Sequence, residues 1–485
     1  MTGTLTRIEK KNPFRVVGDF FKGVVVDFLQ GDIFVKLSLL IMGIGYFRRR
    51  QIIKGLILTI FQIVIIYFAF TFAAFYLARF GTLGTVEFQS VFNPVTMKNE
   101  FNDFDHSFQI LLYSIVSIIV LTGSFLIYLK NIRNVRALEV RAREGKKINT
   151  FFDDVKSAAD ERFHTTLLAL PCSGIILFTI VPLIVMITVA FTNYDQQHMP
   201  PASLFTWVGI ENFKALFENT MSSSFGYAFG IVLSWTLIWA FTATITNFFL
   251  GIALASFINN TKTKLKRVWR TAFVVTIAVP QFVSLLLVRN FFATTGIANT
   301  IASNLGITDF LIEAGLVASH LSHIPFLTDP TWARVMIILI NIWIGVPFTM
   351  LIATGVLMNI PKDLYESARI DGASPFKQYI YITMPYILFV MAPSLVTSIV
   401  HNINNFNVIF LLTNDVFGTR DQMLASSHAR ETDLLITWLY RLTQDQYDYK
   451  MASVIGIMVF VVCAVFTLIA FNLVINRNKE DKFQL

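Results

Sequence analysis

Carboxamide side chains, with one imidazole among them, interrupt three of the longest apolar runs of this 485-residue chain. They are Gln281, Asn341, His401, Asn402, Asn404 and Asn405. A carboxamide donates and accepts hydrogen bonds at once, so such groups suit neutral ligands that are rich in hydroxyl groups. Because an amide is costly to leave facing lipid, we expect these side chains to face other helices or a water-filled path.

The alternative role for these amides is structural. A polar side chain between membrane helices contributes about 1 kcal/mol of interhelical hydrogen bonding, and a single Asn fits that role well. Three amides and a histidine within residues 401–405 fit a polar cavity better. Trp343 and Phe348 can supply apolar faces for a sugar ring, although ordinary helix packing explains them equally well.

The chain lacks the residue patterns of an ATPase, a metalloprotein or a hydrolase. Gly145-Lys146 has no upstream glycine and precedes Lys147, so it is not a phosphate-binding loop. His320-x-x-His323 has no third ligand close by, and we interpret both as solvated loop histidines. No nucleophile and base can be paired by spacing. We therefore predict no catalysis, no metal site and no cofactor bound by this chain.

The composition is that of a membrane protein. Hydrophobic residues make up 55% of the chain and charged residues only 14%, whereas soluble domains carry about 25% charged residues. A helix needs about 20 apolar residues to cross a bilayer. Eight runs meet that need, namely residues 54–79, 108–130, 165–192, 229–257, 267–289, 333–358, 386–412 and 451–476. We expect an all-α integral membrane protein with eight transmembrane helices.

A ninth apolar run, residues 33–47, contains Lys36 and precedes three arginines. It is short for a transmembrane helix. We interpret it as an interfacial helix, with a short span as the alternative.

The charged residues predict the orientation of the spans. Loops 131–164 and 258–270 and the tail 477–485 are basic, whereas loops 80–107 and 193–228 hold more acidic than basic residues. The positive-inside rule therefore assigns both termini to the cytoplasm, in a multi-pass protein of the cell membrane. This topology also explains the net charge of +8. We therefore predict that the chain lies in a lipid bilayer and binds no nucleic acid.

A polar insert, residues 361–385, interrupts the apolar pattern between the sixth and seventh runs. Pro361 suits the first turn of a helix. Asp371-Gly372 is predicted to end this helix, and Ser374-Pro375 to cap and begin a second one. A short helix, a glycine break and a second helix beside a membrane form a rigid knob that another protein can grip.

The insert resembles the EAA loop of ABC-importer permeases. Glu366-Ser367-Ala368, three residues, Gly372, nine residues and Ile382-x-Met384-Pro385 follow the order Glu-Ala-Ala, Gly, Ile-x-Leu-Pro of that loop, with mild departures at Ser367 and Met384. The resemblance implies coupling helices that dock into a cleft of an ATP-binding subunit. The implied coupling residues are Glu366, Ser367, Ala368, Asp371 and Gly372.

Over residues 165–476 the chain resembles the MalF-type permease subunit of maltose/maltodextrin importers. The matching segments are FTNY at 191–194, WVGIENFKALF at 207–217, AVPQFVS at 278–284, TDPTWARVMIILINIWIGVPF at 328–348, NINNFNVIFLLTN at 402–414 and TDLLITWLYRL at 432–442. The resemblance implies a six-helix type I ABC importer permease core at 165–476. It is preceded by a cytoplasmic segment, 1–53, with the interfacial helix, and by two extra N-terminal helices and a basic loop, 54–164. A cytoplasmic tail, 477–485, follows the core.

The same resemblance implies partners and sugar contacts. In that family the permease pairs with a second homologous, MalG-like permease and a MalK-like ATPase dimer that binds ATP and Mg, and an extracytoplasmic binding protein delivers maltose or maltodextrin. The implied sugar contacts are Asn341, Ile344, Gly345, Phe348, Asn402 and Asn405. Ile277, Gln281 and His401 stand at further contact positions, where the family has Tyr, Ser and Phe. The large extracytoplasmic insert of some members is absent from residues 193–228.

The sequence therefore predicts the membrane permease subunit of an ATP-driven maltose or maltodextrin importer. An ABC permease of the same build for another oligosaccharide or polyol is the first alternative. An ion-coupled secondary transporter and a non-transporting scaffold or sensor are further alternatives. Ion coupling usually needs an intramembrane carboxylate, and no span holds an obvious one. Neither of these last two explains an ATPase-docking loop.

Overall fold

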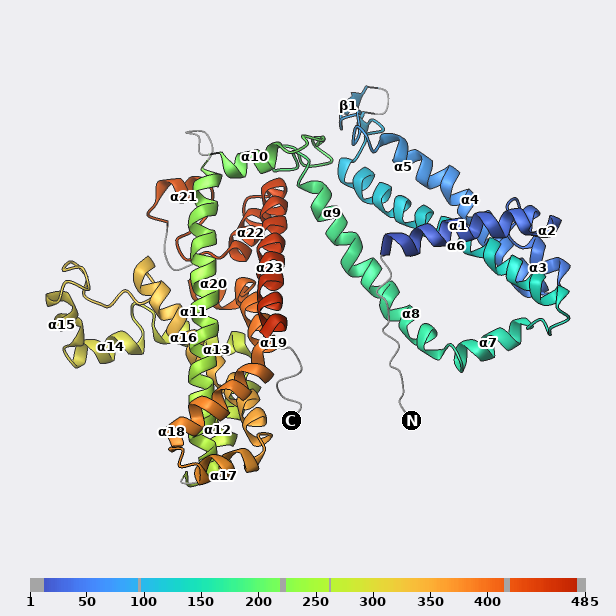
Figure 1. The fold of residues 1–485 in the computed structure, drawn as a ribbon. Coiled ribbons are helices and arrows are strands. Elements are labelled where there is room, and N and C mark those ends of the chain that lie inside the picture. Colours follow the sequence, from blue (N-terminus) through green and yellow to red (C-terminus); the bar gives the residue numbers. More distant parts are fainter. Residues whose placement is uncertain (1–12, 95–96, 219–223, 261–262, 414–418, 478–485) are drawn as a thin grey trace. The chain divides into compact units, whose positions relative to one another are not determined.

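The computed structural model describes residues 13–94, 97–218, 224–260, 263–413 and 419–477. Over these residues the chain is almost entirely helical and separates into two compact units, Met1–Trp207 and Val208–Leu485 (Figure 1). Each unit has its own membrane-length helices.

The first unit combines three membrane-length segments with a hairpin and short helices. Its elements are α1 Pro13–Gln30, α2 Ile33–Leu37, α3 Ile44–Arg48, α4 Ile52–Phe68, the π-helix η1 Ala69–Ala73, α5 Ala74–Arg79, β1 Ser90–Asn93, β2 Lys98–Phe101, α6 Ser107–Arg143, α7 Phe151–Ala159, α8 Phe163–Ile175, the π-helix η2 Ile176–Ile180 and α9 Val181–Val189. The segment α4–η1–α5 packs antiparallel to α6. The Ser114 hydroxyl donates to the Tyr76 carbonyl at 3.0 Å, and Leu58 packs against Ile132 farther along.

The second unit is built around α11. Its elements are α10 Glu211–Phe217, α11 Phe225–Asn259, α12 Lys266–Ala278, α13 Gln281–Phe291, α14 Ile297–Asn304, α15 Ile307–Glu313, α16 Pro330–Met358, α17 Lys362–Ile370, α18 Pro375–Gln378, the π-helix η3 Tyr379–Thr383, α19 Met384–Ile403, α20 Phe406–Thr413, α21 Gln422–Ser426, α22 Leu435–Gln444 and α23 Tyr449–Arg477. Its core joins Phe248 and Ile252 of α11 to Met350 of α16 and Ile387 of α19.

The long helices confirm the all-α membrane fold. Within the described residues, seven helices are long and apolar enough to cross a bilayer, and one bent pair raises the number to as many as eight. The seven are Ile52–Arg79, Ser107–Arg143, Phe163–Val189, Phe225–Asn259, Pro330–Met358, Pro375–Thr413 and Tyr449–Asn472, and the bent pair is Lys266–Ala278 with Gln281–Phe291. Each overlaps one of the eight predicted runs.

The fifth predicted span, residues 267–289, is not a single straight helix. The axes of α12 and α13 meet at 92°. Pro280 explains the break, because proline has no N–H to donate and keeps the preceding residue out of the helical region. Val279 accordingly has an extended backbone, with φ −76° and ψ 127°. The apolar run alone did not indicate this bend.

We infer that the bent pair crosses the membrane once, because its neighbours α11 and α16 run in the same direction. Near one end of both helices, Asn259 Nδ2 lies 3.1 Å from Thr354 Oγ1. Near the other end, the Arg334 guanidinium lies 4.9 Å from the centre of the Trp235 ring. Two parallel neighbours need one crossing between them in the chain, and α12–α13 is the apolar segment that provides it.

The N-terminal part differs from the prediction in two ways. Residues 33–47, expected to form one interfacial helix, hold the five-residue helix α2 and the first residues of the five-residue helix α3, so neither helix is long enough to span a membrane. The 18-residue α1 was not expected, because its apolar residues are interspersed with charged ones.

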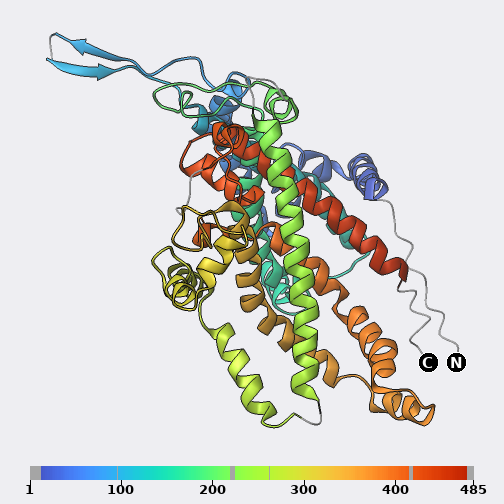
Figure 2. The same ribbon diagram turned by 90° about the vertical axis from the view of Figure 1, so that its left-hand side faces the viewer.

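A hairpin is a small exception to the all-α fold. Strands β1 and β2 pair antiparallel, with Ser90 opposite Phe101 and Asn93 opposite Lys98. Figure 2 shows the hairpin extending away from the helices of its own unit. It occupies the loop predicted at residues 80–107.

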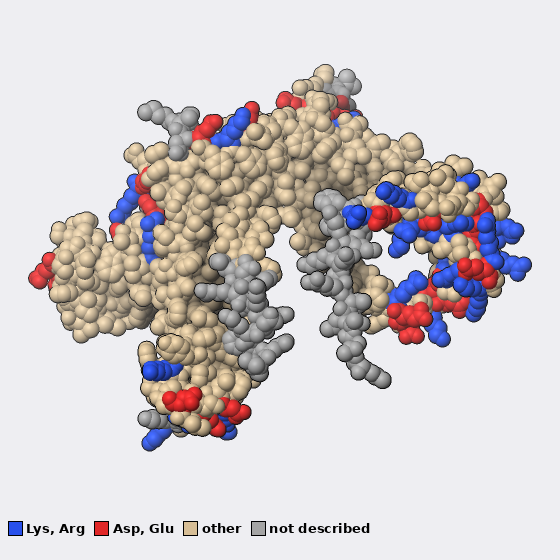
Figure 3. All heavy atoms as spheres, viewed as in Figure 1, with Lys and Arg blue, Asp and Glu red and all other residues tan. Residues whose placement is uncertain are grey.

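Charged side chains lie toward the ends of the helices in each unit (Figure 3). In the first unit they gather at the end that holds α2, α3 and α7. In the second unit one group surrounds α17, and the side of the long helices is largely free of charge in this view. This is the pattern expected for helices that cross a bilayer.

Candidate functional site

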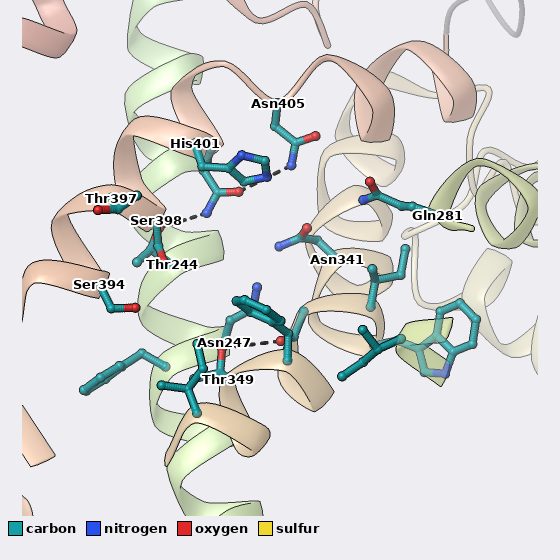
Figure 4. Close-up of a pocket in the computed structure, with 18 of the residues that line it drawn as sticks. Thr244, Asn247, Gln281, Asn341, Thr349, Ser394, Thr397, Ser398, His401 and Asn405 are labelled. Atoms are coloured by element: carbon teal, nitrogen blue, oxygen red, sulfur yellow. Dashed lines mark hydrogen bonds between the residues drawn. The ribbon is translucent and has the colours of Figure 1, made fainter. Parts of the chain in front are cut away.

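A cavity of about 740 Å³ lies in the second unit between α11, the α12–α13 bend, α16 and α19. Its lining includes every residue that the sequence predicted for substrate binding (Figure 4). These are Gln281, Asn341, Ile344, Gly345, Phe348, His401, Asn402 and Asn405. Ile277 lines it as well. Side chains from separate helices therefore meet in one place.

The end of α19 supplies one wall of the cavity. The helix stops at Asn404, and α20 starts two residues later. Asn402 Nδ2 donates to Thr244 Oγ1 of α11 at 2.9 Å, and Asn405 Nδ2 donates to Asn402 Oδ1 at 3.4 Å. These two amides are buried and joined to their surroundings, so they hold the helix break in place while facing the cavity. Asn404 is not part of the lining and contacts Cys463 instead.

A second wall comes from α16. Asn341, Ile344, Gly345 and Phe348 are three or four residues apart and therefore share one helix face. Asn341 is only 5% exposed. Among the described residues its Nδ2 has no hydrogen-bond partner. A buried donor without a partner is costly, which makes this amide well suited to bind a ligand.

Asn247 of α11 is a lining residue that the sequence analysis did not single out. It faces Gly345, where an added Cβ would lie 2.2 Å from Asn247 Nδ2. Its Oδ1 is buried and has no partner within the described chain. The criterion that identified the other amides, a carboxamide inside an apolar run, would have found Asn247 within residues 229–257. Gly345 leaves the room that this side chain needs.

The rest of the lining is uncharged and rich in hydroxyl groups. The hydroxyl residues are Thr244, Thr276, Ser284, Thr349, Ser394, Thr397 and Ser398. Among the described residues no Asp, Glu, Lys or Arg lines the cavity. The Trp343 and Phe348 side chains are about half exposed and offer apolar faces. Amides and hydroxyls around aromatic surfaces suit a neutral ligand with many hydroxyl groups.

The polar insert forms the short helix α17, a break at Asp371-Gly372 and the start of a second helix, as the sequence predicts, and this second helix continues from α18 through η3 into α19. α17 is capped by Asp371, and Gly372 follows with φ +74°, a left-handed conformation that glycine adopts easily. The Gly372 N–H donates to the Arg369 carbonyl at 3.1 Å. Ser374 caps α18, where its hydroxyl accepts from the Lys377 N–H at 3.4 Å. Both helix boundaries therefore lie at residues identified from the sequence.

One face of this loop is anchored and the other is exposed. The Tyr365 and Thr383 hydroxyl oxygens lie 2.8 Å apart and join α17 to η3. Ile370 and Phe376 are 87% and 74% exposed. Of the predicted coupling residues, Ala368 is half-buried and the others are exposed, namely Glu366, Ser367, Asp371 and Gly372. Exposed apolar side chains grouped on a rigid loop favour contact with another protein.

Comparisons with known proteins agree with these features. Residues 247–479 match the family described as "Binding-protein-dependent transport system inner membrane component". The chain is 32% identical over 465 residues to the maltodextrin transport system permease protein MalC of Streptococcus pneumoniae, which covers 95% of this chain and 100% of MalC. It is 33% identical over 424 residues to the galactooligosaccharides transport system permease protein GanP of Bacillus subtilis, which covers 87% of this chain and 93% of GanP.

A solved structure shares the fold. A chain of a bacterial ABC transporter involved in the import of the acidic polysaccharide alginate has a TM-score of 0.53 and 24% sequence identity. The match covers 67% of this chain and 99% of that chain.

Proposed function

Because the chain belongs to the binding-protein-dependent inner membrane components, the permease subunits of ABC importers, we propose that it carries neutral oligosaccharides, foremost maltodextrins, across the cell membrane. It is a multi-pass membrane component and not the catalytic subunit of its transporter. We propose the cargo of this permease, its partner subunits and its orientation in the membrane.

The main support for a neutral cargo is the lining of the cavity. Carboxamides and hydroxyls converge there on a space with aromatic faces and, within the described residues, no Asp, Glu, Lys or Arg side chain. An acidic oligosaccharide would need cationic partners, because a charge is expensive to remove from water without one. A sugar hydroxyl can accept from Asn341 Nδ2 and donate to Asn247 Oδ1, the two buried polar atoms of the cavity lining that lack a partner within the described residues.

Maltodextrin is the preferred cargo because the relative with a full-length match, MalC, is a maltodextrin permease. The positions that match the MalF family's contacts, Asn341, Gly345, Asn402 and Asn405 among them, support the same choice. Galactooligosaccharide import is the second candidate. The similarity to GanP favours it, at 33% identity over 87% of the chain.

Importers of this family work with ATPase subunits, a second permease and a binding protein. We assign the α17–α18 loop as the contact with a MalK-like ATPase dimer, on which ATP and Mg are bound. A MalG-like permease would cover the side of the cavity where Trp343 and Phe348 are exposed. An extracytoplasmic binding protein would deliver the sugar. In this arrangement Glu366 to Gly372 transmit the movement of the ATPase to the permease core, residues 165–476.

Transport by the reconstituted complex tests this proposal. The chain is purified with its partners, placed in proteoliposomes and supplied with the binding protein and ATP. We expect uptake of labelled maltotriose, competition by longer maltodextrins and no competition by an oligosaccharide of uronic acids. Exclusive uptake of galactooligosaccharides would select the second candidate. Uptake without ATP, driven by an ion gradient, would refute the importer class.

Asn341→Leu tests the assignment of the cavity in the same assay. Loss of one hydrogen bond to the sugar should lower uptake about three- to tenfold. Asn404→Leu is the matched control, because it removes an amide close by that does not line the cavity. We expect this control to transport normally. Unchanged kinetics in Asn341→Leu would assign that amide to helix packing alone.

A further inference from the structure

The membrane-crossing part of α6 ends at Lys130. Residues 110–129 carry no charged side chain, and at 1.5 Å per residue they form about 30 Å of helix, the thickness of a bilayer's hydrocarbon core. α6 continues as a helix to Arg143. The residues after Leu129 therefore lie at the level of the lipid headgroups and in the water beyond. The positive-inside rule assigns this end to the cytoplasm.

At this level a hollow of about 1,110 Å³ opens between α1 and α6. Six basic residues line it, against two acids. The basic residues are Lys130, Arg133, Arg136, Arg141, Lys146 and Lys147, and the acids are Asp27 and Glu144. A concave surface with such an excess of positive charge concentrates anions.

Part of this positive charge is already neutralised by ion pairs. The pairs are Arg133 with Asp27 at 3.3 Å, Arg136 with Glu139 at 2.6 Å, Lys146 with Glu144 at 2.7 Å and Lys147 with Asp153 at 3.9 Å. Within the described part of the chain, Lys130 and Arg141 have no such acidic partner. These two cations are therefore available to an anion from outside the chain.

α1 also carries an exposed apolar surface, on the side of the helix away from its hollow-lining residues Asp27 and Gln30. Phe21, Val25 and Leu29 are four residues apart, lie along one side of the helix and are 42%, 56% and 64% exposed. Val24, about 100° around the helix from Val25, is buried in a cluster with Ile132 and Val135 of α6. An amphipathic helix with an exposed apolar stripe and cations close by is typical of a membrane interface.

We propose that α1 and the basic end of α6 form a binding site for an anionic phospholipid. The lipid phosphate binds Lys130, the first position beyond the hydrocarbon core, and the acyl chains lie along Leu126 and Ile127, exposed apolar residues one turn before it on α6. Arg141 is about 16 Å farther along α6, beyond a Debye length of about 8 Å, so it adds a weaker attraction. The site lies wholly in the first unit and uses no residue of the sugar cavity.

Lipid titration of the purified transporter tests this site. The complex is freed of native lipid in mild detergent and titrated separately with phosphatidylglycerol, phosphatidylcholine and inorganic phosphate, with bound molecules counted by native mass spectrometry. We expect phosphatidylglycerol to bind and the other two to bind at least fivefold more weakly. Lys130→Gln should weaken phosphatidylglycerol about fivefold, the effect of one cation near a membrane surface. Arg141→Gln should weaken it less.

Lys156→Gln is the matched control, because it removes one exposed cation of the same unit that does not line the hollow. We expect this variant to bind phosphatidylglycerol like the unaltered chain. Equal losses in Lys130→Gln and Lys156→Gln would show a general effect of charge and overturn the site. Equal binding of inorganic phosphate and phosphatidylglycerol would show a free-anion site and overturn the assignment to lipid. Either failure would leave the transport assay, and thus the proposed function, unaffected.

Discussion

Where α11 meets α16, the Asn247 side chain occupies the space that a side chain at position 345 would need. A Cβ at Gly345 would lie 2.2 Å from Asn247 Nδ2, so the carboxamide would have to move. We expect Gly345→Ala to raise the KM for sugar uptake about three- to tenfold, the loss of about one hydrogen bond. The stability of the complex should change little, because the displaced group is the end of a side chain and not the backbone. Initial uptake rates at several sugar concentrations measure this.

Asn247→Ala is the partner variant for a double-mutant cycle. In that background Gly345→Ala should cost no further affinity, because the group that it displaces is already absent. Additive losses would mean that Gly345 acts independently of Asn247. The cycle therefore separates a positioning role from a direct contact between the sugar and the Gly345 backbone.

At the level of single residues, the sequence predicted the composition of the cavity well. Amides inside apolar runs must face protein or water, and that constraint brought Gln281, Asn341 and Asn402 to the same space. It could not distinguish Asn404 from Asn405, because the side of the chain that each occupies depends on where α19 ends. The pairing of Asn247 with Gly345 depends on the contact between two helices, which no single run of sequence contains.

The bend between α12 and α13 is the element that brings Ile277 and Gln281 to the cavity. Pro280 leaves Val279 extended, and the two helices meet at 92°. Pro280→Ala restores an N–H and removes the restriction on Val279, so we expect a straighter, more continuous helix over residues 266–291. Uptake should fall by at least tenfold while the complex still assembles. Spin labels at Thr271 and Leu287 should report a longer separation.

Pro393→Ala is the control for that variant. Pro393 lies inside α19, which continues through it, so replacing it should not change the path of the helix across the membrane. Normal uptake by Pro280→Ala with an unchanged label distance would show that packing against neighbouring helices, and not the proline, sets the bend.

The break between α17 and α18 has a similar local cause. Gly372 has φ +74° and donates its N–H to the Arg369 carbonyl at 3.1 Å. Proline satisfies neither requirement, since its φ is fixed near −65° and it has no N–H. We expect Gly372→Pro to insert normally and to abolish both transport and stimulation of the ATPase. ATP hydrolysis by proteoliposomes, with and without binding protein and sugar, measures the second effect.

Gly372→Asn is the conservative comparison, because asparagine tolerates the left-handed region better than other side chains. No neighbouring atom lies within 4 Å of an added Cβ at this position. This variant should keep most of its transport. Full transport by Gly372→Pro would contradict the assignment of the loop to coupling.

The elements that the sequence predicted best are those fixed by one strong physical requirement. Crossing about 30 Å of hydrocarbon demands a long apolar helix, and seven of the eight runs form such helices within the described residues, while the fifth forms the bent pair α12–α13. The boundaries of α17 and α18 followed from proline, glycine and serine at the helix ends. α1 and the β1–β2 hairpin were missed because each is stabilised by contacts or pairing that a hydrophobic run does not display.

On the scale of the whole chain, the contacts in the second unit fix the relative directions of its spans. α19 runs opposite to α11, since Asn402 near its end bonds Thr244 and Ile387 near its start packs with Ile258. The α17–α18 loop therefore lies at the same end of this unit as the end of α11. The sequence predicted a core boundary near residue 165, whereas contacts separate the units after Trp207. The predicted boundary remains a prediction.

Cysteine labelling tests the orientation and the crossing by α16 together. Cys172 and Cys463 lie within spans and are replaced by Ser, and single cysteines are placed at Asp309 of α15 and Glu366 of α17, both exposed positions. If α16 crosses once, these two positions lie on opposite sides. A membrane-impermeant maleimide added to intact cells should label Asp309→Cys at once. It should label Glu366→Cys only after the cells are permeabilised.

Two other labelling results would contradict these assignments. The reverse pattern would place the EAA-like loop outside the cell, away from any ATPase, and would overturn the proposed coupling. Labelling of both positions from one side would mean that α16 does not separate them, contrary to its 29 apolar-rich residues. Both termini can be cytoplasmic only if the number of crossings is even. The bent helix pair, by crossing once, supplies the eighth crossing that makes the number even.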